Sequence, residues 1–204
     1  MEPRRVVAGP EALAEAVRVV KAGGLVAVPT DTVYGLACDP SRDPAVRALF
    51  EAKGRESKPV PLLCAGIAAA ESFVVLNPRA KKLARLHWPG ALTIVAPLRV
   101  GAKVSSLVHQ GSGYVGVRMP NSDFCIALAG KAGGAVTGTS ANLSGQPSCR
   151  TAEQVIQSLG ASISLVVDGG RLRGKESTVV KVLDETVEVL REGSVRIQAG
   201  DLKQ

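Results

Sequence analysis

Short apolar runs alternate along this chain with segments of helical periodicity, and this alternation restricts the possible folds more than any other feature. Residues 10–22 place Leu13, Ala16 and Val20 on one face of a helix. Two glycines then end the helix, and the run LVAVP at 25–29 has the length of a short buried strand. Because strands alternate with helices and then crowd the C-terminal end, the pattern predicts a single α/β domain with a mixed sheet and helices packed on it.

The remaining elements follow from the same signals. We expect Asp43, Ser122 and Thr151 to cap the helices that follow them. The glycine- and serine-rich residues 101–113 are typical of a surface loop. No internal repeat or linker interrupts 1–204, so we expect one domain with a core at about 10–197. The predicted helices are 10–22, 43–54, 66–74, 78–88, 122–132 and 151–160, and the predicted strands are 25–29, 59–64, 91–98, 114–120, the start of 134–148, 162–170 and a hairpin over 177–193.

Composition limits the class of protein and its partners. The formal net charge of +7 favours an anionic partner such as a nucleotide, a phosphate or RNA, although a merely basic surface is the alternative. The four cysteines form no CxxC pair, which argues against a zinc site and favours reduced thiols, with a disulfide as the alternative. Neither a membrane-spanning run nor a secretory signal is recognisable, so we expect a cytoplasmic protein.

Polar or basic clusters follow several of the predicted elements. PTDTVYG follows the first strand, KGRESK follows the second helix, and TGTSANLSG follows a later strand. In α/β proteins such loops converge on a common crevice where ligands bind, so we expect a small-molecule site there.

For three groups of candidate residues, a purely structural role is the alternative to ligand binding. Arg118 lies inside the apolar strand GYVGVRMP, where it either faces solvent or grips a carboxylate or phosphate. The second group is Lys53, Arg55 and Lys58. These are either solvated charges at a helix C-terminus, where cations offset the helix dipole, or an anion clamp. The run at 140–142 (SAN) is either a plain turn or a cradle for phosphate oxygens.

Several common active-site patterns are absent from the sequence. There is no GxGxxG fingerprint, no GxxxxGK[ST] loop, no GxSxG elbow and no HExxH. The only two histidines, His87 and His109, form no recognisable Ser-His-Asp pattern. Chemistry based on substrate positioning and cationic stabilisation therefore suits this chain better than nucleophilic or zinc hydrolysis.

Taken together, the motifs resemble those of the YrdC-like family, in its single-domain form. The matching segments span most of the chain in the expected order: PTDTVYGLA at 29–37, KGR at 53–55, VGVRMP at 115–120, TSANLSG at 139–145 and ESTVV at 176–180. The resemblance implies a twisted open mixed sheet with helices around a basic concave cavity. One departure is the run KGRESKPVPLLCA, which places Leu63 or Cys64 near the position of a family histidine.

The resemblance implies threonylcarbamoyl-AMP synthase activity. Such enzymes convert L-threonine, bicarbonate and ATP, with Mg²⁺ on the triphosphate, and a downstream tRNA threonylcarbamoyl transferase complex uses the product to make t6A at adenosine 37. Carried over to this sequence, the implied threonine and bicarbonate contacts are Thr32, Tyr34, Arg118 and Ser177. The implied ATP contacts are Arg55, Lys58, Ser140, Asn142, Ser148 and Arg191, and the implied catalytic set is Lys53, Arg55, Ser140 and Asn142, with no protein-held metal.

Two other functions compete with this one. A structured-RNA-binding module would also use a basic cavity, so weak RNA binding by this chain stays open. Such a module needs aromatic side chains on which bases stack, and the aromatic content is only 3%. A carbamoyl-transfer domain of the kind fused into hydrogenase-maturation proteins shares the fold. Those proteins are larger, and their acylphosphatase-like and zinc-finger segments are not found in this sequence. If the site is as implied, Lys53→Ala or Arg55→Ala lowers turnover by roughly a hundredfold while the fold survives.

Overall fold

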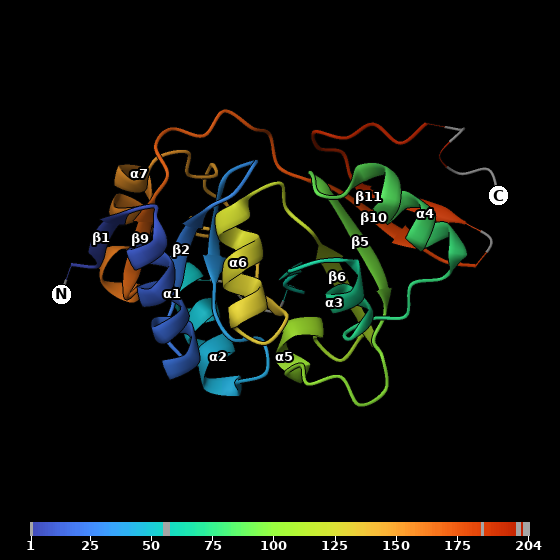
Figure 1. Cartoon of the computed structure of the whole chain (residues 1–204), viewed down its shortest axis with the longest axis horizontal. Helices are drawn as coiled ribbons and strands as arrows, with labels where there is room; N and C mark the ends of the chain where they lie inside the picture. The colour runs from blue at the N-terminus through green and yellow to red at the C-terminus, as the bar shows by residue number, and fades with distance from the viewer. Residues whose placement is uncertain (1, 55–57, 185, 199–200, 202–204) are drawn as a thin grey trace.

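The computed structural model describes residues 2–54, 58–184, 186–198 and 201, and their strands form two mixed sheets (Figure 1). The first sheet has the order β1 (Arg4–Val7), β9 (Leu165–Asp168), β2 (Val26–Pro29), β3 (Tyr34–Ala37) and β8 (Thr139–Ser140). The second has the order β11 (Val187–Arg191), β10 (Thr178–Val182), β5 (Leu92–Pro97), β6 (Tyr114–Arg118), β4 (Leu62–Cys64) and β7 (Ala135–Thr137). The α/β class with mixed pairing is confirmed, but the strands divide into two sheets where the sequence predicts one.

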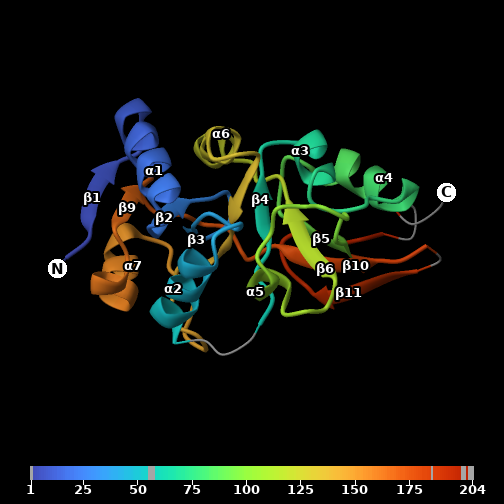
Figure 2. The same ribbon diagram turned by 90° about the horizontal axis from the view of Figure 1, so that it is seen from below.

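Helices cover both faces of the first sheet. Figure 2 shows α1 (Pro10–Ala22) and α6 (Asp123–Lys131) on one face, and α2 (Asp43–Lys53) and α7 (Ala152–Leu159) on the other. The same view places α3 (Ile67–Glu71) and α4 (Pro78–His87) against the second sheet. None of the helices in the described ranges is long and apolar enough to cross a membrane.

Burial by helices on both faces explains why strand β2 is an uninterrupted apolar run. Val26 and Val28 belong to the cluster that includes Ala16 of α1 and Leu128 of α6. Ala27, between them, belongs to the cluster that includes residues of α2 and α7. Because successive strand residues point to opposite faces and both faces are buried, every position must be apolar.

The two sheets meet where β7 passes into β8 through Gly138. The backbone N–H of Thr137 donates to the carbonyl of Cys38 at 3.0 Å, and the N–H of Cys38 donates to the Thr137 hydroxyl at 2.8 Å. The chain therefore passes from the second sheet to the first within a few residues, and the seam between the sheets lies beside β3.

Most predicted helix boundaries are confirmed. Gly23 ends α1 in the left-handed conformation with φ of 90°, and the Ser122 and Thr151 hydroxyls cap their helices. The prediction that Asp43 is an N-cap is wrong, since Asp43 is the first residue of α2 and Arg42 precedes it without a side-chain cap. The first turn of α2 contains a proline, whose missing N–H needs no partner there.

Several elements in the described part of the chain lie where the sequence predicts none, among them β1, β3 and α5 (Ser106–His109). Strand β1 pairs in parallel with β9, and β3 pairs antiparallel with β2, with Pro29 opposite Tyr34. Residues 30–33, of which the first three are polar, are thus the turn of a hairpin and not the end of an isolated strand. Helix α5 lies within the predicted loop 101–113, where Val108 is buried in the core and holds one helical turn in place.

Candidate active site

A cavity of about 640 Å³ lies between the two sheets. The β2–β3 turn and the 138–140 segment form its wall on the first sheet, and β4, β5, β6, β10 and β11 contribute the wall on the second. Val60, Leu63, Val95, Val179 and Leu190 supply apolar surface. The polar or charged side chains that line it are Thr30, Thr32, Tyr34, Lys58, Thr93, Ser112, Tyr114, Arg118, Thr139, Ser140, Glu176, Ser177 and Arg191.

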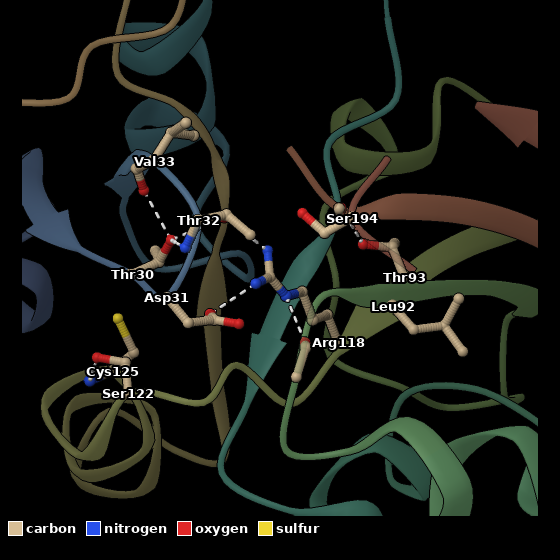
Figure 3. A network of polar contacts seen from close by, with 12 residues as sticks. Thr30, Asp31, Thr32, Val33, Leu92, Thr93, Arg118, Ser122, Cys125 and Ser194 are labelled. Carbon is tan, nitrogen blue, oxygen red and sulfur yellow. Dashed lines mark hydrogen bonds and ion pairs between the residues drawn. The ribbon is translucent and has the colours of Figure 1, made fainter. Parts of the chain in front are cut away.

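Arg118 is buried in this cavity and is held from three sides (Figure 3). Its Nη2 donates to Asp31 Oδ1 at 2.6 Å, its Nη1 donates to Thr32 Oγ1 at 3.2 Å, and its Nε donates to the Gly90 carbonyl at 2.9 Å. A guanidinium has five N–H groups, so within the described part of the chain two remain for a ligand. Such a fixed fork is suited to a carboxylate or a phosphate.

The arginine also bridges the two sheets. Arg118 ends β6 in the second sheet, whereas Asp31 and Thr32 lie in the β2–β3 turn of the first. The Asp31 and Arg118 side chains are 15% and 7% exposed, so this ion pair is largely desolvated. Asp31 was not among the predicted site residues, although a buried arginine needs an anionic partner and a carboxylate precedes Thr32 directly.

The β2–β3 turn presents two hydroxyls to the cavity. Thr30 Oγ1 donates to the Val33 carbonyl at 2.6 Å and accepts from the Thr32 N–H at 3.0 Å. The two threonine hydroxyl oxygens are 2.9 Å apart. Thr32, which the sequence singled out, is therefore held by Thr30, which it did not.

Opposite this turn, Ser177 joins β5 to β11. Its Oγ lies 2.9 Å from Thr93 Oγ1. Arg191 Nη2 donates to the same oxygen at 3.1 Å and to the Ser177 carbonyl at 2.8 Å. Both predicted residues thus lie together in the cavity, and Thr93 completes a wall rich in hydroxyls.

Cations outnumber anions along the cavity. Its described lining contains Lys58, Arg118 and Arg191, against the single carboxylate of Glu176. A hydrogen bond from Ser148 and the nearby charges of Arg191 and Arg150 lower the pKa of Glu176, so this carboxyl is ionised at neutral pH. Ser148 itself, predicted as an ATP contact, lies outside the cavity lining and acts on it through Glu176.

Lys53 holds the loop after β8 from beneath. It is 3% exposed, and its Nζ donates to the carbonyls of Ser140 and of Asn142, the latter at 2.7 Å. Asn142 is also buried, and its Nδ2 donates to the Leu143 and Gln146 carbonyls. Of these three predicted catalytic residues, only Ser140 lines the cavity, whereas Lys53 and Asn142 shape the loop that carries it. The fourth, Arg55, lies outside the described residues.

Tyr34 lines the cavity, but its hydroxyl forms hydrogen bonds with the backbone that follows β9. The hydroxyl donates to the Gly170 carbonyl at 2.9 Å and accepts from the Gly169 N–H at 3.1 Å. Asp168 Oδ1 lies 3.4 Å from the same hydroxyl, and the other carboxylate oxygen, Oδ2, accepts from Arg5 of β1 at 2.6 Å. The phenol ring therefore forms cavity wall, while its polar end ties β3 to the end of β9.

Burial raises the pKa of Tyr34 to about 12. Because the folded pKa exceeds the unfolded value of about 10, Tyr34 contributes stability below about pH 10 that is lost as pH rises toward 12. In an alkaline absorbance titration, Tyr34→Phe is expected to remove a phenolate step near pH 12 that wild-type protein shows. Retention of that step in the variant would contradict the assignment.

The crossover segment from β9 to β10 passes close over the β2–β3 turn. A Cβ added at Gly174 would lie 2.5 Å from the Thr32 Cα and 2.7 Å from the Asp31 carbonyl oxygen. Gly174→Ala is expected to lower the free energy of unfolding by about 1–3 kcal/mol and to displace Thr32, since backbone atoms cannot yield cheaply. Urea denaturation measures this, with Gly66→Ala as control, because a Cβ there meets nothing within 4 Å. Equal stability of the two variants would contradict the close packing.

Comparison with known proteins assigns the fold to a family. A family model named Sua5/YciO/YrdC and described as "Telomere recombination" matches residues 18–193. The chain is 38% identical over 186 residues to a threonylcarbamoyl-AMP synthase of Bacillus subtilis, covering 90% of this chain and 54% of that protein. It is 37% identical over 161 residues to one of Vibrio vulnificus, covering 77% of this chain and 86% of that protein.

A solved structure gives the same result at the level of the fold. The crystal structure of Pyrococcus abyssi Sua5 complexed with L-threonine is similar with a TM-score of 0.86 at 33% identity, over 94% of this chain and 57% of that one. The chain thus spans about half the length of several curated relatives that it matches.

Proposed function

This chain belongs to the Sua5/YciO/YrdC family, and on that premise we propose that it is a threonylcarbamoyl-AMP synthase. It would convert L-threonine, bicarbonate and ATP to threonylcarbamoyl-AMP and pyrophosphate, as a nucleotidyltransferase acting in tRNA t6A synthesis. Its relatives in Bacillus and Vibrio carry that name, and the Pyrococcus relative was crystallised with L-threonine.

The observation that carries the proposal is the Arg118 guanidinium, which is fixed by three hydrogen bonds and retains two N–H groups beside a row of hydroxyls. An α-amino acid offers one carboxylate, which a guanidinium fork binds in bidentate fashion. Thr32 and Ser177 lie on the two sides of the cavity and supply the hydroxyl contacts. These contacts support an amino-acid subsite at the seam between the sheets.

The nucleotide would occupy the cationic part of the cavity. Lys58 and Arg191 line it, and Ser140 marks the loop that Lys53 and Asn142 support. Together with Arg55, these groups would compensate the charge of the triphosphate. Oriented cations act strongly on a phosphoryl group in a partly desolvated site.

The residues also fit a Mg²⁺ ion that arrives with ATP. Among the described residues, no group of three His, Cys, Asp or Glu side chains could hold a metal by itself. Mg²⁺ in nucleotide sites is held mainly by phosphate oxygens and water with one or two carboxylates, and Glu176 is the carboxylate available here. When bound, the ion would neutralise charge that develops on the phosphates.

The proposed chemistry has two steps. The threonine amine attacks bicarbonate to form a carbamate, with loss of water. A carbamate oxygen then attacks the α-phosphate, and pyrophosphate leaves. Each reactant carries negative charge, so the work of Arg118, Lys58 and Arg191 is to hold the reactants together and in line.

Pyrophosphate release from ATP by the purified protein tests the function, with threonine and bicarbonate each omitted in turn. We expect release only when both are present. ATP turnover that ignores threonine, or none from folded protein, would contradict the proposal. The product would pass to a tRNA threonylcarbamoyl transferase complex in the cytoplasm.

A further inference from the structure

The first part of the crossover segment, residues 169–175, supports the wall of the cavity that the first sheet provides. It contains neither helix nor strand and runs from the end of β9 toward β10, from one sheet to the other (Figure 1). Its first two residues form hydrogen bonds with the Tyr34 hydroxyl, and Gly174 packs on the backbone of Thr32. The position of this segment therefore affects how two cavity-lining residues lie.

The segment begins in a glycine turn at 169–170 that a carboxylate holds. Asp168 Oδ1 accepts from the Gly170 N–H at 2.9 Å. Gly170 has φ of 75°, the left-handed conformation that glycine adopts without strain. A Cβ added at Gly169 would lie 2.6 Å from the Pro29 Cβ, so the turn also packs closely against the end of β2. The Asp168 carboxylate and the Tyr34 hydroxyl thus hold a turn that has no side chains of its own.

Arg5 of β1 determines how this carboxylate lies. Its Nη2 and Nε both donate to Asp168 Oδ2, at 2.6 and 3.0 Å, while Oδ1 accepts from the Gly170 N–H. Charge-assisted hydrogen bonds of this kind are short and fix the geometry of both groups. The hydrogen bond from Arg5 is the main reason that the pKa of Asp168 is lowered, so the carboxylate is ionised at neutral pH. Glu153 of α7 holds the guanidinium as well, with its Oε1 2.5 Å from Arg5 Nη2.

We infer that Arg5 is a positioning residue for the cavity. Through the Asp168 carboxylate it holds the glycine turn, and the turn sets the crossover segment against Tyr34 and Thr32. Arg5 does not itself line the cavity, and it lies outside residues 18–193, on which the family assignment depends. The inference rests on the proposed function for the identity of the substrate, whereas the action of Arg5 on the turn and the cavity wall can be tested without substrate.

The alternative is that this ion pair only attaches β1 to β9. The Arg5 and Asp168 side chains are 42% and 17% exposed, and ion pairs in contact with water add little to stability. Loss of the pair should therefore change stability only slightly, whereas a displaced cavity wall would weaken binding of the substrate that touches it. Arg4 offers a matched comparison, because it precedes Arg5 in β1 and forms an ion pair with Glu15 of α1 at 3.0 Å.

Arg5→Gln is expected to raise the KM for L-threonine roughly tenfold, while the KM for ATP and kcat stay within about threefold, because the displaced wall is the one that would contact the amino acid. An amide has one oxygen, so Asp168→Asn can satisfy Arg5 or the Gly170 N–H but not both. It should raise the same KM, and the double variant should lose no more than either single one. Arg4→Gln should change each constant by less than about twofold, and its urea midpoint should be similar to that of Arg5→Gln.

Amide hydrogen exchange followed by NMR tests the inference without substrate. The Gly170 N–H should exchange roughly tenfold faster in Arg5→Gln than in wild-type protein, because its acceptor is no longer fixed. The NMR signals of Tyr34 and Thr32 should shift in the same variant. In Arg4→Gln, both the exchange rate and these signals should be those of wild-type protein.

Other results overturn the inference. Unchanged exchange of the Gly170 N–H in Arg5→Gln would show that Arg5 does not hold the turn. Faster exchange with an unchanged KM for L-threonine would show that the turn does not act on the cavity. An equal rise of both KM values together with a lower urea midpoint would indicate a structural role only. If wild-type protein releases no pyrophosphate, the proposed function fails, and the exchange rate and the Tyr34 and Thr32 signals still decide whether Arg5 positions the cavity wall.

Discussion

Arg118→Ala is expected to lower the free energy of unfolding by about 3–5 kcal/mol, because it leaves the Asp31 carboxylate without its buried partner. The same change should reduce pyrophosphate release with threonine by roughly a hundredfold or more, since the carboxylate fork is lost. Urea denaturation and the pyrophosphate assay measure the two effects separately.

The double variant Asp31→Asn, Arg118→Ala is the control for this prediction. It removes both charges, so it should recover part of the lost stability while turnover stays low. If Arg118→Ala unfolded at the wild-type urea concentration, the pair would not be the desolvated contact that its 15% and 7% exposures indicate.

Lys53→Met is expected to lower the free energy of unfolding by about 2–4 kcal/mol, because two buried carbonyls lose a charged donor while the apolar stem is kept. The loop that carries Ser140 should lose its fixed position, so turnover should fall by roughly a hundredfold. That the fold survives replacement of Lys53 stays a prediction, but a cost in stability is expected because its ammonium is buried against backbone carbonyls.

Lys131→Met is the matched control, since Lys131 lies exposed at the end of α6. Urea denaturation of both variants, followed by the pyrophosphate assay, tests the prediction. Lys53→Met protein with normal stability and low turnover would indicate direct contact with substrate instead of support of the loop.

Elements with local signals could be predicted from the sequence. Helices α1, α6 and α7 have an apolar face together with a Gly end or a Ser or Thr cap, and each lies within two residues of its predicted range. Strand β1 could not be found in this way, because its residues are mostly exposed and its support is parallel pairing with β9, more than 150 residues away. Such pairing leaves no periodicity within four residues.

The same distinction applies to the site. Residue types pointed to Arg118 and Ser140, and the family resemblance added Thr32, Ser177 and Arg191; all five line one cavity. Sequence alone could not show that Lys53 lies beneath a loop instead of facing a ligand, because a lysine at a helix end usually extends into solvent.

Arg118 joins a strand of one sheet to a turn of the other, so a change in the spacing between the sheets would also change the shape of the proposed amino-acid subsite. On the proposed function, a core substitution that shifted one sheet relative to the other would alter the fit of the amino acid, even without touching the cavity. Attempts to change the proposed substrate preference should therefore begin with the packing that sets the sheet separation, and substitute the cavity-lining residues only afterwards.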